Sequence, residues 1–93
     1  MAVAVDVRLP TLLRSQAGGQ SSVTVEAATI GDVLRELVSE FPGMAGQLLN
    51  DDGSLHRFVN VYVNDDDVRY LEALETPVKE GDEVSLLPAV AGG

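Results

Sequence analysis

The 93-residue sequence contains no cysteine and no tryptophan, and aromatic residues make up only 4% of it. Without cysteine the chain has no disulfide, no thiolate metal site and no thiol nucleophile, and redox chemistry gives no information about its compartment. Hydrophobic residues nevertheless amount to 45%, so we expect an aliphatic core. A chain of this length has room for one such core, and therefore for one domain.

Basic residues are also few. Six Lys and Arg stand against 15 Asp and Glu, which gives a formal charge of -9. Nucleic acids and anionic membranes repel such a charge, so neither is an expected partner. The same charge can steer a small protein toward basic surfaces on partner enzymes, although an ordinary solvated acidic surface explains the composition equally well.

Long hydrophobic runs are absent. The apolar stretch at the N-terminus, Met-Ala-Val-Ala-Val, is followed at once by Asp6 and Arg8. It is too short for the apolar region of a signal peptide or for a membrane span. A cytoplasmic protein is therefore expected.

Residue types suited to catalysis or metal binding form no recognisable constellation. His56 is the sole histidine, and no Ser-His-Asp or Cys-His spacing accompanies it. The run Asp65 to Asp67 lacks the alternating spacing of a calcium loop and fits a turn. Gly18-Gly19 is not followed by Gly-Lys-Ser/Thr and fits a loop. We therefore predict no catalytic residue, no metal site and no bound cofactor, and a protein that is not an enzyme.

The first half of the chain predicts a hairpin followed by a helix. Residues 2–9 alternate apolar and polar side chains, and the alternation resumes at Val23 and Val25 after Pro10 and a polar loop. Thr29, with Asp32 three residues later, has the pattern of a helix N-cap. Apolar residues then recur at helical spacing: Ile30, Val33, Leu34, Leu37 and Phe41.

The helix is predicted to end at Pro42-Gly43, and a weaker short helix follows over residues 44–49. Residues 57–63 form the clearest strand, ended by a turn at residues 64–66. The second half then predicts smaller elements: an edge strand at Val68-Arg69, one helical turn at residues 71–74 and a last strand at residues 83–87.

This order of elements, ββαβ(β)β, fits either a split ferredoxin-like arrangement or a mixed sheet crossed by one helix. Only one long helix is readable, which favours a single helix against one sheet face. The predicted fold is α+β, a β-grasp (ubiquitin-like) fold with a mixed sheet of four to five strands.

The chain ends on Ala-Gly-Gly. Residues 1–88 are expected to form the domain, and residues 89–93 a flexible tail that reaches roughly 17 Å when extended. Glycines at the tip have no Cβ to clash in a narrow channel, although a frayed terminus is common in any domain. The predicted tail residues are Val90, Ala91, Gly92 and Gly93.

The C-terminal carboxylate of Gly93 is the group on which chemistry is expected. An α-carboxyl has a pKa of about 3.3 to 3.7, so at neutral pH it is ionised and nearly inert as an acyl donor. Adenylation with ATP would give a mixed anhydride, and a sulfur donor could then displace AMP to leave a thiocarboxylate. ATP would be used by the activating enzyme, not held by this chain.

A docking patch is predicted on the open face of the sheet. If Val59, Val61 and Val63 face the helix, strand alternation turns Phe58 and Tyr62 outward. Leu87 faces outward by the same argument, and an antiparallel pairing of the two strands would bring it near Phe58. Exposed apolar and aromatic residues mark interfaces, unless a local loop covers them. The predicted partner-binding residues are Phe58, Tyr62 and Leu87.

Three segments carry a resemblance to a known family: Pro10-Thr11-Leu12-Leu13-Arg14, residues 56–65 (HRFVNVYVND) and residues 86–93 (LLPAVAGG). The chain resembles sulfur carriers of the ThiS and MoaD type, and most closely the actinobacterial CysO carriers. This resemblance implies three partners: an E1-like adenylyltransferase that also installs sulfur, a PLP-dependent cysteine synthase acting on O-phosphoserine, and a JAMM-type zinc peptidase that releases cysteine.

Two other functions remain open from the sequence. The same chemistry would serve a molybdopterin synthase small subunit or a carrier for a secondary-metabolite or thiolation pathway. A β-grasp interaction module with a passive tail is the third possibility. Neighbouring genes separate them, because a PLP synthase with a JAMM-type peptidase favours cysteine synthesis.

Overall fold

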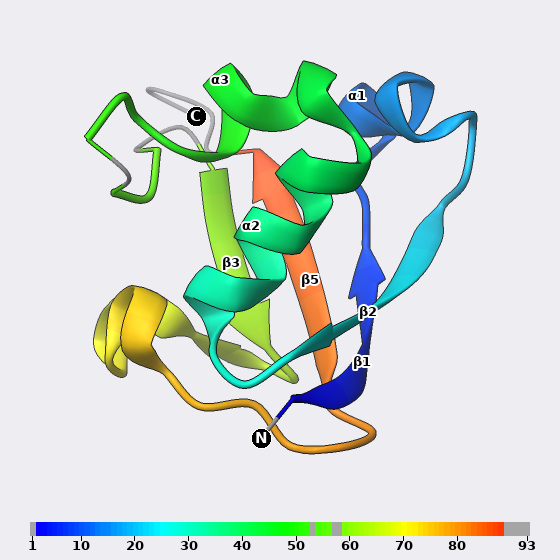
Figure 1. Ribbon diagram of the computed structural model, residues 1–93. Coiled ribbons are helices and arrows are strands. Elements are labelled where there is room, and N and C mark those ends of the chain that lie inside the picture. Colours follow the sequence, from blue (N-terminus) through cyan, green and yellow to red (C-terminus); the bar gives the residue numbers. More distant parts are fainter. Residues whose placement is uncertain (1, 53, 57–58, 89–93) are drawn as a thin grey trace.

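A five-stranded mixed sheet with one long helix across a single face forms the framework of the protein (Figure 1). The computed structural model describes residues 2–52, 54–56 and 59–88. The strands are β1 (Val3–Arg8), β2 (Ser22–Ala27), β3 (Val59–Val63), β4 (Asp66–Asp67) and β5 (Glu83–Pro88). The sheet order is β2-β1-β5-β3-β4. The predicted β-grasp architecture is confirmed.

The last strand, β5, occupies the middle of the sheet. It runs parallel to β1, with Val7 beside Val84, and antiparallel to β3, with Val61 beside Leu86. β1 and β2 form the predicted antiparallel hairpin. The strand that leads into the C-terminal tail is therefore held by backbone hydrogen bonds on both edges.

The long helix α2 (Ile30–Glu40) begins where the sequence indicates. The Thr29 hydroxyl oxygen accepts a hydrogen bond from the Asp32 backbone N–H at 3.3 Å, which satisfies one of the free amides of the first turn. The helix ends before Pro42, whose ring cannot continue it. Its fully buried side chains are Ile30, Val33, Leu34 and Leu37.

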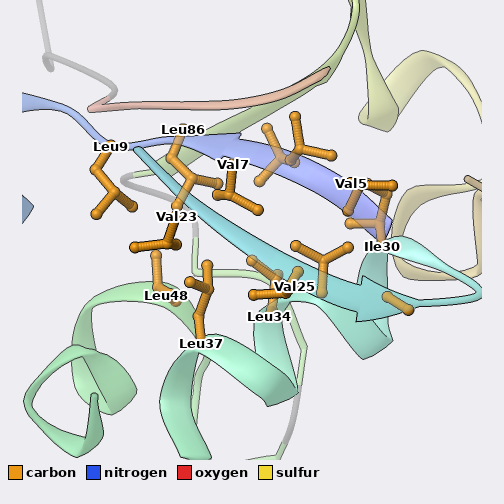
Figure 2. Packing of buried hydrophobic residues seen from close by; sticks show 14 of the residues in the cluster. Val5, Val7, Leu9, Val23, Val25, Ile30, Leu34, Leu37, Leu48 and Leu86 are labelled. Atoms are coloured by element: carbon orange, nitrogen blue, oxygen red, sulfur yellow. The ribbon is translucent and has the colours of Figure 1, made fainter. Parts of the chain in front are cut away.

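The core lies between α2 and the covered face of the sheet (Figure 2). Within the described ranges, the buried side chains are aliphatic apart from Met44 and the polar Thr76. Period-2 alternation along the strands explains its composition, since every second side chain points to the helix. The predicted inward residues are all buried: Val59, Val61, Val63, Val84 and Leu86. Phe41 packs against this core only in part.

The connection between β1 and β2 is more ordered than the predicted polar loop. It contains α1 (Thr11–Arg14) and a 3-10 turn, η1 (Ser15–Ala17), which ends at Gly18 with a φ of 68°. Leu13 and Ala17 are buried, so the turn closes one end of the core. The glycine-rich sequence marks the end of this turn, because only glycine adopts such a φ at no cost.

The segments between α2 and β3 and between β4 and β5 differ in detail from the prediction. The short helix appears as η2 (Pro42–Met44) and α3 (Ala45–Leu48). The prediction of an edge strand at Val68-Arg69 is wrong. The short strand β4 ends before Val68, and residues 68–70 form a 3-10 turn, η3 (Val68–Tyr70). There the Asp67 carboxylate accepts the Arg69 backbone N–H at 2.8 Å, which caps a helical turn. The predicted turn at 71–74 lies at η4 (Ala73–Glu75).

The first turn of α2 makes stability depend on pH. The Arg35 guanidinium, and after it the Ala28 backbone N–H, hold the pKa of Asp32 below its ordinary value. A lowered carboxyl pKa stabilises the fold at neutral pH, and this contribution is lost as pH falls below about 4. We expect Asp32→Asn to lower the melting temperature at pH 7 and to flatten its decline in acid. Thermal melts of both proteins across the acid range check this, and parallel declines would contradict it.

Candidate partner-binding face and C-terminal tail

The strand that precedes the predicted tail ends beside the first residue of β3. β5 ends at Pro88, which pairs with Val59. The predicted tail residues, Val90, Ala91, Gly92 and Gly93, lie outside the described residues, which end at Pro88, the predicted last residue of the domain. Their roles remain predictions. The structure does establish that the strand preceding them is the central one.

Two of the three predicted docking residues lie on the open face of the sheet. Leu87 is 47% exposed and pairs with Asn60, while the half-buried Tyr62 pairs with Ser85 two positions along the same two strands. Directly paired residues share a face, so Tyr62 and Leu87 are diagonal neighbours. Phe58 lies outside the described residues, and its part in the patch stays a prediction.

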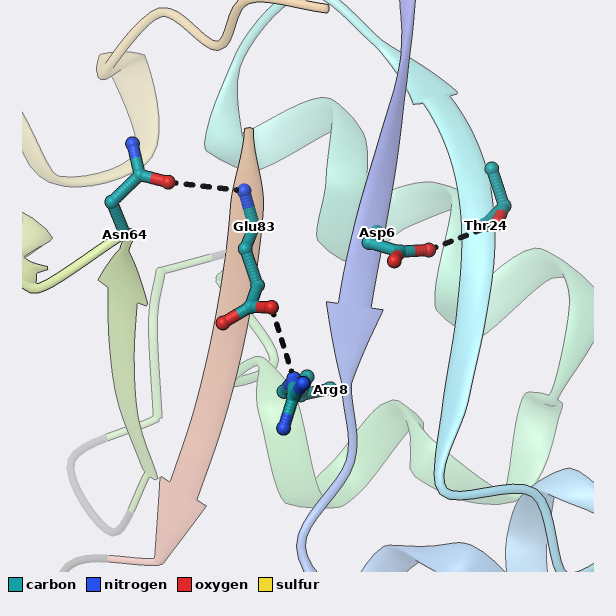
Figure 3. Close-up of polar contacts among 5 residues, drawn as sticks. All are labelled: Asp6, Arg8, Thr24, Asn64 and Glu83. Atoms are coloured by element: carbon teal, nitrogen blue, oxygen red, sulfur yellow. Dashed lines mark hydrogen bonds and ion pairs between the residues drawn. The ribbon is translucent and has the colours of Figure 1, made fainter. Parts of the chain in front are cut away.

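The opposite side of the same face is polar (Figure 3). The Arg8 Nε atom lies 3.0 Å from a carboxylate oxygen of Glu83, and this ion pair joins β1 to β5. The Thr24 hydroxyl donates to Asp6 at 3.1 Å between β2 and β1. The open face therefore changes from polar at β1 and β2 to more apolar at the end of β5.

Arg69 is a structural residue that sequence reasoning missed. Its Nη1 donates to the side-chain oxygen of Asn60 at 2.7 Å, and its Nη2 donates to the carbonyls of Val59 at 2.9 Å and His56 at 3.1 Å. One guanidinium thus holds the start of β3, next to the strand that leads to the tail. The contacts span 9 to 13 positions in the sequence, and no local pattern predicts them.

Metal and membrane sites receive no support from the described parts of the chain. Among residues 2–52, 54–56 and 59–88, no three His, Cys, Asp or Glu side chains gather where they could hold a metal ion. No helix in these ranges has the length and apolar character that a membrane span requires.

Comparison with known proteins decides the family. A sequence profile of the ThiS family matches residues 7–93, which include the terminal glycines. The chain belongs to the ThiS family. It is 47% identical to the sulfur carrier protein CysO of Mycobacterium tuberculosis, over 96% of this chain and 98% of that protein. A putative sulfur carrier protein of Archaeoglobus fulgidus is 39% identical over 98% of this chain and all of its own length.

The ThiS-family assignment agrees with the three-dimensional structure. A CysO chain from Amycolatopsis orientalis, crystallised in a BexX/CysO complex, superposes with a TM-score of 0.87 at 46% identity. The match covers 96% of this chain and 99% of the other. The predicted resemblance is therefore confirmed, and the chain is a sulfur carrier of the CysO type by sequence and by fold.

Proposed function

We propose that the protein carries sulfur as a thiocarboxylate on Gly93 and delivers it for the synthesis of cysteine from O-phosphoserine. The observation that supports this most is the match of the ThiS-family profile through residue 93, together with 47% identity to a CysO carrier along nearly the whole chain. In this proposal the protein is a cosubstrate of other enzymes and catalyses nothing itself.

The chemistry takes place on the carboxylate. Attack of the Gly93 carboxylate oxygen on the α-phosphorus of ATP forms a mixed anhydride and releases pyrophosphate. A sulfur nucleophile then attacks the acyl carbon, and AMP leaves with the electron pair of the broken bond. Adenylation is needed because the free carboxylate, ionised at neutral pH, is a poor acyl donor. This chain provides the acyl group and a tip without side chains, while ATP belongs to the activating enzyme.

Three partners follow from this role: an E1-like adenylyltransferase that also transfers sulfur, a PLP-dependent cysteine synthase and a JAMM-type zinc peptidase. Support for a protein partner comes from the Amycolatopsis relative, which was crystallised in complex with BexX. We propose that Phe58, Tyr62 and Leu87 contact such partners while the tail enters their active sites. The central position of β5 supports this arrangement, because docking close to Leu87 fixes the direction in which the tail leaves.

Mass spectrometry of the intact protein tests the proposal. After incubation with the E1-like enzyme, ATP and a sulfide source, the protein is expected to gain the mass difference of one sulfur for one oxygen, confined to the C-terminal peptide. A sample without ATP is the control. An unchanged C-terminal peptide, while a known carrier is converted in parallel, would overturn the proposal.

A second measurement separates the cysteine pathway from its alternatives. The thiocarboxylate form is offered to the PLP-dependent synthase with O-phosphoserine, and cysteine joined to Gly93 is the expected product. If the thiocarboxylate forms but the synthase does not consume it, the carrier serves another sulfur acceptor, such as a molybdopterin synthase.

A further inference from the structure

The turn that contains α1 is built as a rigid support for one exposed apolar residue. Leu13 is buried, and its backbone N–H donates to the Pro10 carbonyl at 2.9 Å. The Gly19 N–H donates to the Arg14 carbonyl at 2.7 Å and closes the turn. Leu12, between these fixed points, is 65% exposed. A leucine kept in water on a well-anchored turn marks an interaction site more strongly than one on a loose loop.

A groove of about 660 Å³ lies between this turn and β5. Leu12 and Arg14 line its α1 side, and Ser85 and Leu87 line its β5 side. Leu87 belongs to the predicted docking patch, so the groove continues that patch from the sheet onto α1. We call it the α1 groove.

Basic side chains outnumber acidic ones in the lining of the α1 groove, although the chain as a whole is acidic. Its lining contains two arginines, Arg8 and Arg14, and one carboxylate, Glu83, which sum to +1, whereas the whole chain carries -9. Both arginines use Nε in their contacts, Arg8 to Glu83 at 3.0 Å and Arg14 to the Leu9 carbonyl at 3.2 Å. Within the described ranges their terminal amino groups donate no hydrogen bond, so each can still meet a carboxylate in the two-pronged geometry that arginine favours.

We propose that the α1 groove receives an acidic side chain flanked by an apolar one from the protein that activates the tail. The apolar neighbour packs on Leu12 and Leu87, and the carboxylate meets Arg14 and Arg8. This inference rests on the proposed function. It adds an acidic contact on the partner, whereas the overall negative charge of the carrier attracts basic surfaces. Such a reversed contact fixes the docking register and rejects partners that are basic throughout.

Charge reversal at one groove residue, with a matched control, tests the inference. Arg14→Glu reverses a charge in the groove. Lys79→Glu makes the same change in net charge at a residue outside the groove, where no side-chain contact of Lys79 occurs within the described ranges. Calorimetric titration with the E1-like enzyme is expected to give a dissociation constant at least about tenfold higher for Arg14→Glu and within about twofold of the parent for Lys79→Glu. Leu12→Ser is expected to weaken binding in the same direction without changing charge.

Conversion at saturating enzyme separates the two proposals. If the parent protein is converted to the thiocarboxylate but Arg14→Glu binds as well as Lys79→Glu does, the α1 groove is not the contact and the sulfur-carrier function stands. If Arg14→Glu and Lys79→Glu weaken binding equally, the effect comes from net charge, and the proposal for the α1 groove is overturned. If the parent is neither bound nor converted, the proposed function fails, and the inference fails with it. Thermal melts exclude unfolding, and Leu12→Ser provides the measurement if Arg14→Glu is unstable.

Discussion

One extra alanine after Gly93 is expected to abolish thiocarboxylate formation and to leave the melting temperature unchanged. In the proposed mechanism the activating enzyme adenylates the terminal carboxylate, and an added residue moves that carboxylate by roughly 3.5 Å. A displacement of that size takes a reacting atom out of attack distance and costs several orders of magnitude in rate. The added residue lies past the last strand, so folding should be indifferent to it.

Gly92→Ala tests the same requirement through bulk instead of length. The added Cβ is expected to slow conversion strongly, because a side chain enters a channel shaped for backbone alone. Gly46→Ala is the matched control: Gly46 lies in α3, and a Cβ built there meets no atom within 4 Å. Intact-mass time courses follow conversion of all three variants. Normal turnover of the extended protein would show that its terminus does not have to fit a closed site.

Truncation of the neighbouring residues Leu86 and Leu87 is expected to separate stability from partner binding. Leu86 is 1% exposed on the covered face of β5, so Leu86→Ala should lower the free energy of unfolding by about 2 to 5 kcal/mol. Leu87 is 47% exposed on the open face, and Leu87→Ala should cost no more than about 0.5 kcal/mol. For partner binding the order reverses, since Leu87 belongs to the proposed docking patch.

Urea denaturation and calorimetric titration measure the two effects on the same pair of proteins. Folded Leu86→Ala, assayed well below its midpoint, should bind the E1-like enzyme nearly as well as the parent, whereas Leu87→Ala should bind more weakly. If Leu87→Ala binds as well as the parent, the docking patch does not include this residue. If it unfolds as readily as Leu86→Ala, then Leu87 contributes to the core.

The regular elements could be predicted because each carries its own local pattern. Alternation predicted which residues of β3 and β5 face the core, and Thr29 with Asp32 identified the N-cap of α2. The four-residue helix α1 was missed because its stability comes from burying Leu13 and from closure at Gly18, both of which depend on the rest of the fold. Propensity is too weak to predict so short a helix in isolation.

Of the candidate partner-binding face, only the residues whose orientation follows from strand alternation could be predicted. Tyr62 and Leu87 lie on the open face as expected. The hydrogen bonds of Arg69 to the start of β3 and the α1 groove could not be predicted, because both involve segments that are distant in sequence. An edge strand was predicted at Val68-Arg69, yet the Asp67 cap turns the chain there. Packing and capping override a weak local preference.

The parallel pairing of β1 with β5 also determines how the protein responds to mechanical force. Parallel strands begin at the same end of the sheet, so a pull on Val3 and an opposing pull on Pro88 act from opposite ends of the pair. Such a load shears the hydrogen bonds between the strands, and they have to rupture together instead of opening one after another. An enzyme that draws the tail inward would therefore meet a body that resists unravelling from its C-terminal end, and the strain would fall on the tail.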